Sequence, residues 1–214
     1  MASSVINYSL FIKPLPAVAT WTKAEGLVEY ATMEEDEIIR RAKEGDIDSF
    51  NQLVETYQRA VYNLCLRMLG NAPAAEDATQ DAFISAFRGI NRLRGGNFKA
   101  WLFRIAANAC RDQLRSLRRR PSTSLDDAPF EFKSDQPSPE DYAMRQELGE
   151  EIRKAFTTLP PDQRLAVILR DIEGLDYEEI AQVTGSSLGT VKSRINRGRK
   201  RLRHHLEKHR ELFV

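Results

Sequence analysis

Cysteine and histidine are scarce in this chain of 214 residues, which has two cysteines and three histidines. Cys65 and Cys110 each lie in an apolar helical pattern, which is typical of small core residues and not of a disulfide framework. His204, His205 and His209 crowd the C-terminal tail and do not form a metal-ligand cluster. The sequence also lacks a nucleophile motif and a phosphate-binding glycine loop. We therefore expect no metal, no cofactor, no small-molecule substrate and no enzymatic activity.

Long apolar runs are absent too, because no stretch approaches the roughly 20 residues that a membrane-spanning helix needs. The first 32 residues do not combine a basic start with an apolar block, so we expect no signal peptide. They lack helical periodicity and contain Pro14 and Pro16, whereas Met33 begins a well-patterned segment. Residues 1–32 are therefore either a disordered extension or the product of a misassigned start, and both alternatives stay open.

An excess of charge of one sign is missing overall, since the formal net charge is only +1. Along the chain, however, the charges separate. Residues 99–120 are rich in arginine and contain a single acid, Asp112, residues 126–141 are acidic, and residues 192–203 are again basic. Such segregation favours two polyanion-binding surfaces joined by a linker that avoids the polyanion. On charge alone, two solvated helix faces are an equal alternative.

Apolar residues recur at three- and four-residue spacing almost throughout, which predicts an all-α protein. Glycine and proline divide the pattern into helices expected at 34–43, 47–69, 74–88, 98–117, 138–158 and 161–171, followed by two further helices near the C-terminus. Residues 121–137 combine proline, serine and aspartate with little periodicity, as an exposed linker does. Buried contacts across this linker are not evident from the sequence, so we expect two small helical domains, at 33–120 and 138–214, that move independently.

The C-terminal part has the pattern of a helix-turn-helix. Asp176 and Glu179 predict a capping box, Gly185 can supply a left-handed turn, and Ser186-Ser187 can cap a second helix. An apolar stripe then follows that helix, made of Leu188, Val191, Ile195, Leu202 and Leu206. The opposite face carries Lys192, Ser193, Asn196, Arg197 and Lys200, whose side chains can contact base edges or phosphates. A helical hairpin with a solvated basic face is the less favoured alternative.

The helix expected at 98–117 has a different basic face. Phe98, Trp101, Leu102, Ile105 and Ala109 form its predicted inward stripe. Arg104, Asn108, Arg111, Arg115 and Arg118 follow one another at spacings of three and four and so share the other face. This face suits a phosphate backbone, with Asn108 recognising an exposed base. Phe103 and Trp101 could stack on bases, although core packing is the preferred interpretation for Trp101.

The preceding helix is acidic on one side, where Glu76, Asp77, Gln80 and Asp81 cluster, while Phe83, Ile84 and Phe87 pack or protrude. An acidic face so near a predicted DNA-binding face indicates a protein partner with a basic surface. Taken alone, an ordinary solvated helix would explain the same residues.

Three segments together resemble the extracytoplasmic-function (ECF) sigma factors of the sigma-70 family. AEDATQDAFISAFRGI at 75–90 is similar to the segment of this family that binds core RNA polymerase. FKAWLFRIAANACRDQLRSLRRR at 98–120 is similar to the segment that recognises the promoter minus-10 element. Residues 159–203, including GTVKSR at 189–194, are similar to the minus-35 recognition segment. The order and spacing of all three are highly specific.

The resemblance implies a factor that binds core polymerase and directs promoter-specific transcription initiation in a stress or envelope response. Sigma region 2 would cover 33–120 and sigma region 4 would cover 138–214. The acidic linker 121–137 would occupy the polymerase channel near the RNA exit path. The implied partners are the beta-prime clamp and beta flap of core polymerase, promoter DNA and an anti-sigma factor. The protein would be cytoplasmic, and a membrane-anchored anti-sigma factor could hold it at the membrane.

The resemblance also implies three sets of site residues. The core polymerase-binding set is Asp77, Gln80, Asp81 and Phe83. The minus-10 set is Arg104, Asn108, Arg111 and Arg115, with Gly95, Gly96 and Asn97 of the preceding loop. The minus-35 set is Thr190, Lys192, Ser193, Asn196, Arg197 and Lys200. The loop departs from the family pattern because its Gly95-Gly96 pair offers few side chains for base recognition.

The main rival function is an autonomous helix-turn-helix regulator that binds an operator as a dimer. Such a protein needs a dimerisation surface or a ligand pocket. The N-terminal half instead ends in an arginine-lined helix, which a sensory domain would not need. The sequence therefore favours the sigma factor.

Overall fold

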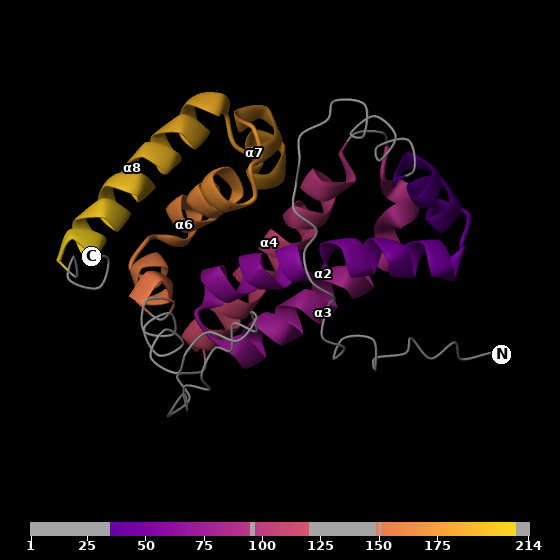
Figure 1. Ribbon diagram of the computed structural model, residues 1–214, viewed down its shortest axis with the longest axis horizontal. Coiled ribbons are helices and arrows are strands. Elements are labelled where there is room, and N and C mark those ends of the chain that lie inside the picture. Colours follow the sequence, from indigo (N-terminus) through magenta and orange to yellow (C-terminus); the bar gives the residue numbers. More distant parts are fainter. Residues whose placement is uncertain (1–34, 95–96, 120–148, 150, 209–214) are drawn as a thin grey trace, which may run out of the picture. The chain divides into compact units, whose positions relative to one another are not determined.

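The computed structural model describes residues 35–94, 97–119, 149 and 151–208 (Figure 1). Over these residues the chain is helical and has no strand, which confirms the predicted all-α class. The extension 1–32, the Gly95-Gly96 pair and the linker 121–137 lie outside the described residues, so the structure does not test the predictions made for them.

The first helices begin and end where the local sequence signals place them. After a helix at residues 35–43, α2 (Ile47–Leu69) begins at Asp46, whose side chain accepts a hydrogen bond from the N–H of Asp48 at 3.1 Å. It ends at Gly70, where φ is 74° and the N–H bonds the carbonyl of Leu66 at 2.7 Å. Glycine adopts this left-handed conformation without steric cost, so Gly70 ends α2 as predicted.

Helix α3 (Ala72–Gly89) begins earlier than the predicted Ala74. The side chain of Asn71 accepts from the N–H of Ala74 at 2.9 Å, so Asn71 caps the helix and does not belong to a loop. Pro73 fits in the first turn because its missing N–H is not needed there. A 3₁₀ turn, η2 (Ile90–Arg92), follows, and α4 (Phe98–Arg119) then completes the N-terminal half.

Helices α2, α3 and α4 pack against one another around a core rich in small residues. Its fully buried members include Leu64, Cys65, Ala78, Ala82, Phe103, Ala106 and Cys110. Both cysteines are free thiols in this core, as predicted. The burial of Phe103 shows that the suggestion of base stacking by this ring was wrong. The inward stripe of α4 was predicted correctly at Phe98 and Leu102, which are buried. It was wrong at Ile105 and Ala109, which are half-exposed, while Ala106 and Cys110 are buried in their place.

The C-terminal half contains helical residues 151–157, then α6 (Pro161–Val167), α7 (Tyr177–Thr184) and α8 (Leu188–Glu207). Helix α6 continues into a π-helical segment, η3 (Ile168–Ile172), which the sequence did not indicate. Helix α8 lies directly on α6 at Gly198, where an added Cβ would be 2.5 Å from Cγ2 of Val167. The absence of a side chain at Gly198 therefore sets how closely the two helices approach.

Hydrogen bonds also join residues on the two sides of the predicted linker. The side chain of Arg164 is 6% exposed and donates to the carbonyl of Met68 at the end of α2, in the other half of the chain. Within its own half it donates to the carbonyls of Thr157 at 2.6 Å and Leu159 at 3.0 Å. Lys99 donates to the carbonyl of Glu173 at 2.8 Å. Contacts between the halves, which the sequence did not make evident, are therefore present, and the independent movement of the two domains stays a prediction.

Candidate polymerase and promoter interfaces

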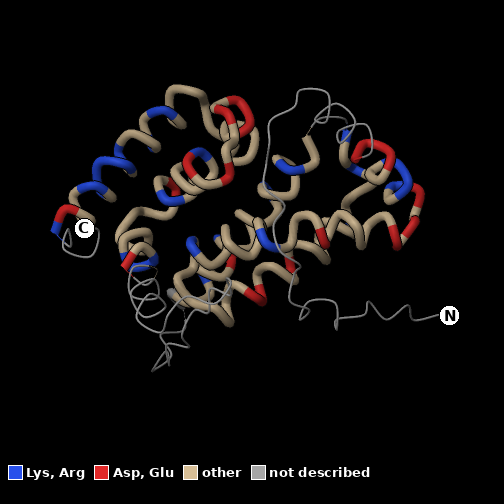
Figure 2. The backbone as a smooth tube through the Cα atoms, in the orientation of Figure 1, with Lys and Arg blue, Asp and Glu red and all other residues tan. Residues whose placement is uncertain are grey.

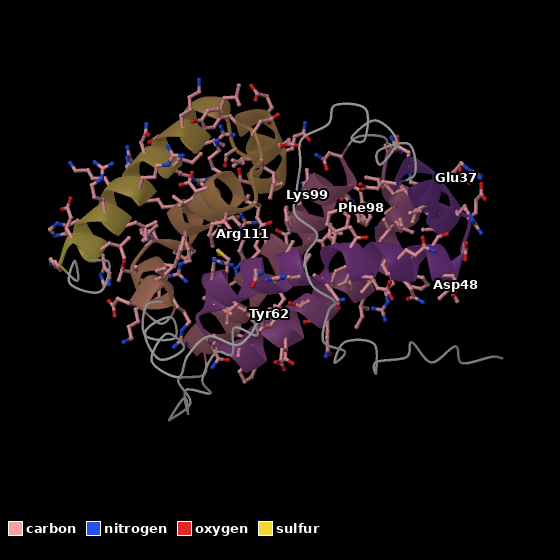
Figure 3. The ribbon with its side chains drawn as sticks, in the orientation of Figure 1. Glu37, Asp48, Tyr62, Phe98, Lys99 and Arg111 are labelled. Atoms are coloured by element: carbon pink, nitrogen blue, oxygen red, sulfur yellow. The ribbon has the colours of Figure 1, made fainter. Side chains whose placement is uncertain are left out.

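The two basic segments predicted from the sequence are helices α4 and α8, and lysine and arginine recur along both in Figure 2. On α4, Arg104, Asn108 and Arg115 are exposed and Arg111 is half-buried. Nη1 of Arg111 donates to Oδ1 of Asn108 at 2.9 Å, so the structure brings these two predicted residues into contact. Arg111 is labelled in Figure 3. Arg115 forms an ion pair with Asp112, the single acid of this segment, at 3.1 Å.

An open groove runs between α3 and α4. One wall includes Asp81 and Arg88 of α3, and the other includes Asn108 and Asp112 of α4. Asp81 belongs to the predicted polymerase-binding set and Asn108 to the predicted minus-10 set. The two predicted surfaces therefore adjoin along this groove.

The described part of the minus-10 loop is fixed by contacts within the chain. Leu93 is buried, and Asn97 is exposed. Oδ1 of Asn97 accepts from the N–H of Ala100 at 3.1 Å and thereby caps α4. Its Nδ2 donates to the carboxylate of Glu179 on α7. Asn97 could recognise a base only after releasing this carboxylate, and its neighbours Gly95 and Gly96 lie outside the described residues.

The acidic side of α3 is on the surface, as predicted. Glu76, Asp77, Gln80 and Asp81 are all exposed. Burial, together with the negative charge of Glu76, raises the pKa of Tyr62 above its usual value. Phe83 is 4% exposed and lies in the core, which corrects the prediction that its side chain contacts the polymerase.

Phe87 is the exposed aromatic residue of α3, with 37% of its surface accessible. Its ring makes an edge-on contact with Phe50 of α2, with 5.0 Å between the centroids. Sequence spacing could not show which of Phe83 and Phe87 is buried and which is exposed, since both fit a helical apolar pattern.

The predicted helix-turn-helix is present with its capping residues. Asp176 accepts from the N–H of Glu179 at 2.7 Å, and Glu179 accepts from the N–H of Asp176 at 2.8 Å. Gly185 follows with φ of 63°, and Ser187 then caps α8 by accepting from the N–H of Thr190 at 3.3 Å. These contacts are local in sequence, which is why the motif was predictable.

The outward face of α8 carries the predicted minus-35 residues together. Thr190, Lys192, Asn196, Arg197 and Lys200 are exposed and Ser193 is half-buried. On the opposite side, Val191 and Ile195 are buried as predicted. Leu188 is 40% exposed, so its assignment to the apolar stripe was wrong. It is the first residue of the helix.

Two other arginines of α8 have structural partners that the sequence did not indicate. Arg194 donates to Oγ of Ser186 at 2.6 Å and to Asp162 of α6 at 2.8 Å. Arg199 forms a two-pronged ion pair with Asp171, and this contact raises the pKa of Arg199 further above its usual value. The acids lie about 30 residues away in sequence, so no local pattern could have identified these pairs. The basic charge of α8 is thus divided between neutralised and exposed side chains.

The described residues bring no three His, Cys, Asp or Glu side chains together in a group that could hold a metal ion. Within the same part of the chain, every helix is too short or too polar to cross a lipid bilayer.

The chain matches two family models, sigma-70 region 2 at residues 53–120 and sigma-70 region 4 at residues 149–202. It is 38% identical over 172 residues to the ECF RNA polymerase sigma-E factor of Escherichia coli, covering 76% of this chain and 88% of that protein. The chain belongs to the ECF sigma factors of the sigma-70 family. The region 2 match contains α3 and α4, and the region 4 match contains α6, α7 and most of α8.

Two further relatives of this sigma factor come from Pseudomonas aeruginosa and Mycolicibacterium smegmatis. It is 39% identical over 178 residues to the RNA polymerase sigma-H factor of Pseudomonas aeruginosa, covering 78% of this chain and 92% of that protein. It is 42% identical over 161 residues to the ECF sigma factor SigE of Mycolicibacterium smegmatis. That match covers 75% of this chain but only 63% of the mycobacterial protein.

Two solved structures resemble this sigma factor. One is the sigma factor RpoE of Bartonella quintana in complex with the anti-sigma factor NepR, with a TM-score of 0.60 and 27% identity, covering 75% of this chain and 98% of that one. The other is CnrH in complex with the cytosolic domain of CnrY, with a TM-score of 0.63 and 26% identity, covering 81% of this chain and 97% of that one.

Proposed function

We propose that this sigma factor binds core RNA polymerase and directs it to promoters that it recognises at both the minus-10 and minus-35 elements. The observation that carries the proposal is the presence of two separate basic faces, on α4 in region 2 and on α8 in region 4. An exposed acidic face on α3 adjoins the first of them. This combination fits one protein partner and two DNA segments. It does not need catalysis, and we assign the protein a regulatory role in place of an enzymatic one.

The acidic face of α3 is proposed to bind the beta-prime clamp of the polymerase through Asp77, Gln80 and Asp81. Exposed carboxylates attract a basic partner and discriminate against acidic ones. Region 4 is proposed to contact the beta flap. The linker at 121–137, between domains at 33–120 and 138–214, would follow the polymerase channel.

The face of α4 is proposed to bind the melted minus-10 strand. Arg104, Arg111 and Arg115 would follow its phosphates, because neutralising phosphates with basic side chains gives binding to a polyanion its salt-dependent affinity. Asn108 and the loop 93–97 would hold an unstacked base, with Gly95 and Gly96 allowing close approach of the backbone and Asn97 supplying the side chain.

The outward face of α8 is proposed to enter the major groove of the minus-35 element. Its residue types suit this role, since arginine bonds guanine edges and asparagine bonds adenine edges in pairs of hydrogen bonds. Thr190, Lys192, Ser193, Asn196, Arg197 and Lys200 would make the contacts. In helix-turn-helix proteins the second helix lies in the major groove, which is the role proposed for α8.

The regulation of this sigma factor is proposed to involve an anti-sigma factor, as the Bartonella relative is bound to one. Its site of action would be the cytoplasm, where core polymerase works, and a membrane-anchored anti-sigma factor could hold it at the membrane. A stress or envelope signal would then release it.

Binding of promoter DNA with and without core polymerase tests the proposal against an autonomous regulator. The full chain should bind a promoter fragment tightly and specifically only when core polymerase is present. Equal specific binding by the chain alone, with a stoichiometry of two chains per site, would favour the regulator instead.

A further inference from the structure

Tyr177 lies at the junction of three elements of region 4. It is the first residue of α7, directly after the capping residue Asp176, and its side chain is half-buried. The guanidinium carbon of Arg170, in η3, lies 4.9 Å from the centroid of the Tyr177 ring. The ammonium nitrogen of Lys192, in α8, lies 5.7 Å from the same centroid. Both distances fall within the range of cation–π attraction.

The two cations are held in place by different means. Nη1 of Arg170 donates to the carbonyl of Leu175 at 2.8 Å, which fixes the guanidinium beside the turn that leads into α7. Lys192 is exposed on α8, and its ammonium group lies beside the ring of Tyr177. A lysine ammonium on a flexible stem loses considerable conformational entropy when it is bound, so a ring that preorders it reduces that cost.

Neither cation has an acidic partner among the residues that the structure describes, in contrast to Arg194 and Arg199 on the same helix. Arg194 pairs with Asp162 and Arg199 with Asp171. Two positive charges at one ring repel each other, and a bound anion would offset this repulsion by attracting both. The arrangement of Arg170 and Lys192 thus favours a negatively charged ligand at this surface.

We propose that Tyr177 is a positioning residue, whose ring orients Arg170 and Lys192 to bind backbone phosphates of the minus-35 duplex. The inference rests on the proposed function, since it deepens the role of Lys192 and adds Arg170 and Tyr177 to the minus-35 surface. Phosphate contacts set the register of a protein on DNA but carry no sequence information. The ring would therefore act on affinity and salt dependence, and base preference would come from Asn196 and Arg197.

The test is the salt dependence of DNA binding by the full chain assembled with core polymerase, measured on a duplex containing the minus-35 element. Tyr177→Leu should weaken binding roughly fivefold and make the slope of log affinity against log salt shallower, because the cations lose their orienting ring. Tyr177→Phe keeps the ring and should behave as the unsubstituted protein. Arg170→Gln keeps the ring and removes one charge, so it should also make the slope shallower, by about one.

Controls separate the possible outcomes. Circular dichroism of each variant checks that region 4 is folded, and if Tyr177→Leu unfolds it, Arg170→Gln and Tyr177→Phe decide the question. The positioning role is overturned if Lys192→Ala weakens binding while Tyr177→Leu and Arg170→Gln do not, or if Tyr177→Phe fails as severely as Tyr177→Leu. It is also overturned if Tyr177→Leu changes base preference and leaves the salt slope intact. If neither Lys192→Ala nor Arg197→Ala affects binding, the proposed minus-35 surface itself is wrong.

Discussion

Arg111 donates a hydrogen bond from Nη1 to Oδ1 of Asn108 at 2.9 Å, within one turn of α4. The bond orients the Asn108 amide so that its NH₂ group remains available to a ligand. It also holds a positive charge beside that amide. A base and its phosphate could thus be bound by neighbouring atoms of one helix face.

Asn108→Ala should lower the affinity of the core-bound protein for a single-stranded minus-10 oligonucleotide about tenfold, because a base-specific contact is lost. The loss should be concentrated at one base position. Arg111→Ala should instead weaken all oligonucleotides alike and reduce the salt dependence. Fluorescence anisotropy with single-base variants of the oligonucleotide measures both effects. A uniform loss for Asn108→Ala would show that this amide recognises no base.

Gln80→Arg combined with Asp81→Arg should abolish binding to core polymerase while the helical content stays unchanged. Substitutions at exposed positions usually alter the free energy of unfolding by less than about 0.5 kcal/mol. The two new positive charges would be repelled by a basic clamp. Glu55→Arg, an exposed charge reversal on α2, is the matched control and should bind core normally. Normal core binding by the double variant would mean that another face contacts the polymerase.

Arg197→Ala and Lys192→Ala should fail in different ways on the minus-35 duplex. Arg197 lies mid-helix on the outward face, so its loss should remove about 1–3 kcal/mol at one base position. Lys192 lies nearer the start of α8, so its loss should affect all sequences equally and reduce the salt slope. A panel of single-base promoter variants at two salt concentrations separates the two patterns. If Arg197→Ala weakens every sequence alike, Arg197 contacts phosphate only.

Gly198→Ala should destabilise region 4 by about 1–3 kcal/mol, as overpacking does. The added Cβ would lie 2.5 Å from Cγ2 of Val167 and 3.3 Å from the carbonyl oxygen of Gln163. Gly189→Ala is the control, because a Cβ there meets nothing within 4 Å. It should not destabilise region 4, since the added methyl group meets no atom and alanine is at least as favourable as glycine in a helix. Urea denaturation followed by circular dichroism measures the free energy of unfolding of both variants. An unchanged value for Gly198→Ala would show that α6 and α8 move apart easily enough to accommodate the added methyl group.

The sequence predicted those parts of the fold whose causes are local. The end of α2 at Gly70, the capping box of Asp176 and Glu179, and the cap of α8 at Ser187 all depend on residues a few positions apart. The start of α3 was missed because Asn71 and Pro73 are as typical of a loop as of a helix N-terminus.

What the sequence could not predict depends on which helix face meets a neighbour. Phe83 and Phe103 are buried because α3 and α4 turn those positions toward the core, whereas their spacing allowed either side. Met68, which accepts from Arg164, and Asp171, which pairs with Arg199, lie in other helical segments, so no local pattern revealed these contacts. The site residues were predictable as exposed helix faces, and their contacts, such as that of Tyr177 with Lys192, required the tertiary structure.

Run-off transcription with purified core polymerase and the full chain tests the central proposal most directly. On a template carrying a promoter of this factor, selected from genomic fragments that the core complex retains, the full chain should produce a transcript from one defined start. The Gln80→Arg, Asp81→Arg double variant and the Asn108→Ala variant should both reduce that transcript strongly. A transcript of equal amount and start from core polymerase alone, or none from a complex that binds core normally, would contradict the assignment of this protein as a promoter-directing sigma factor.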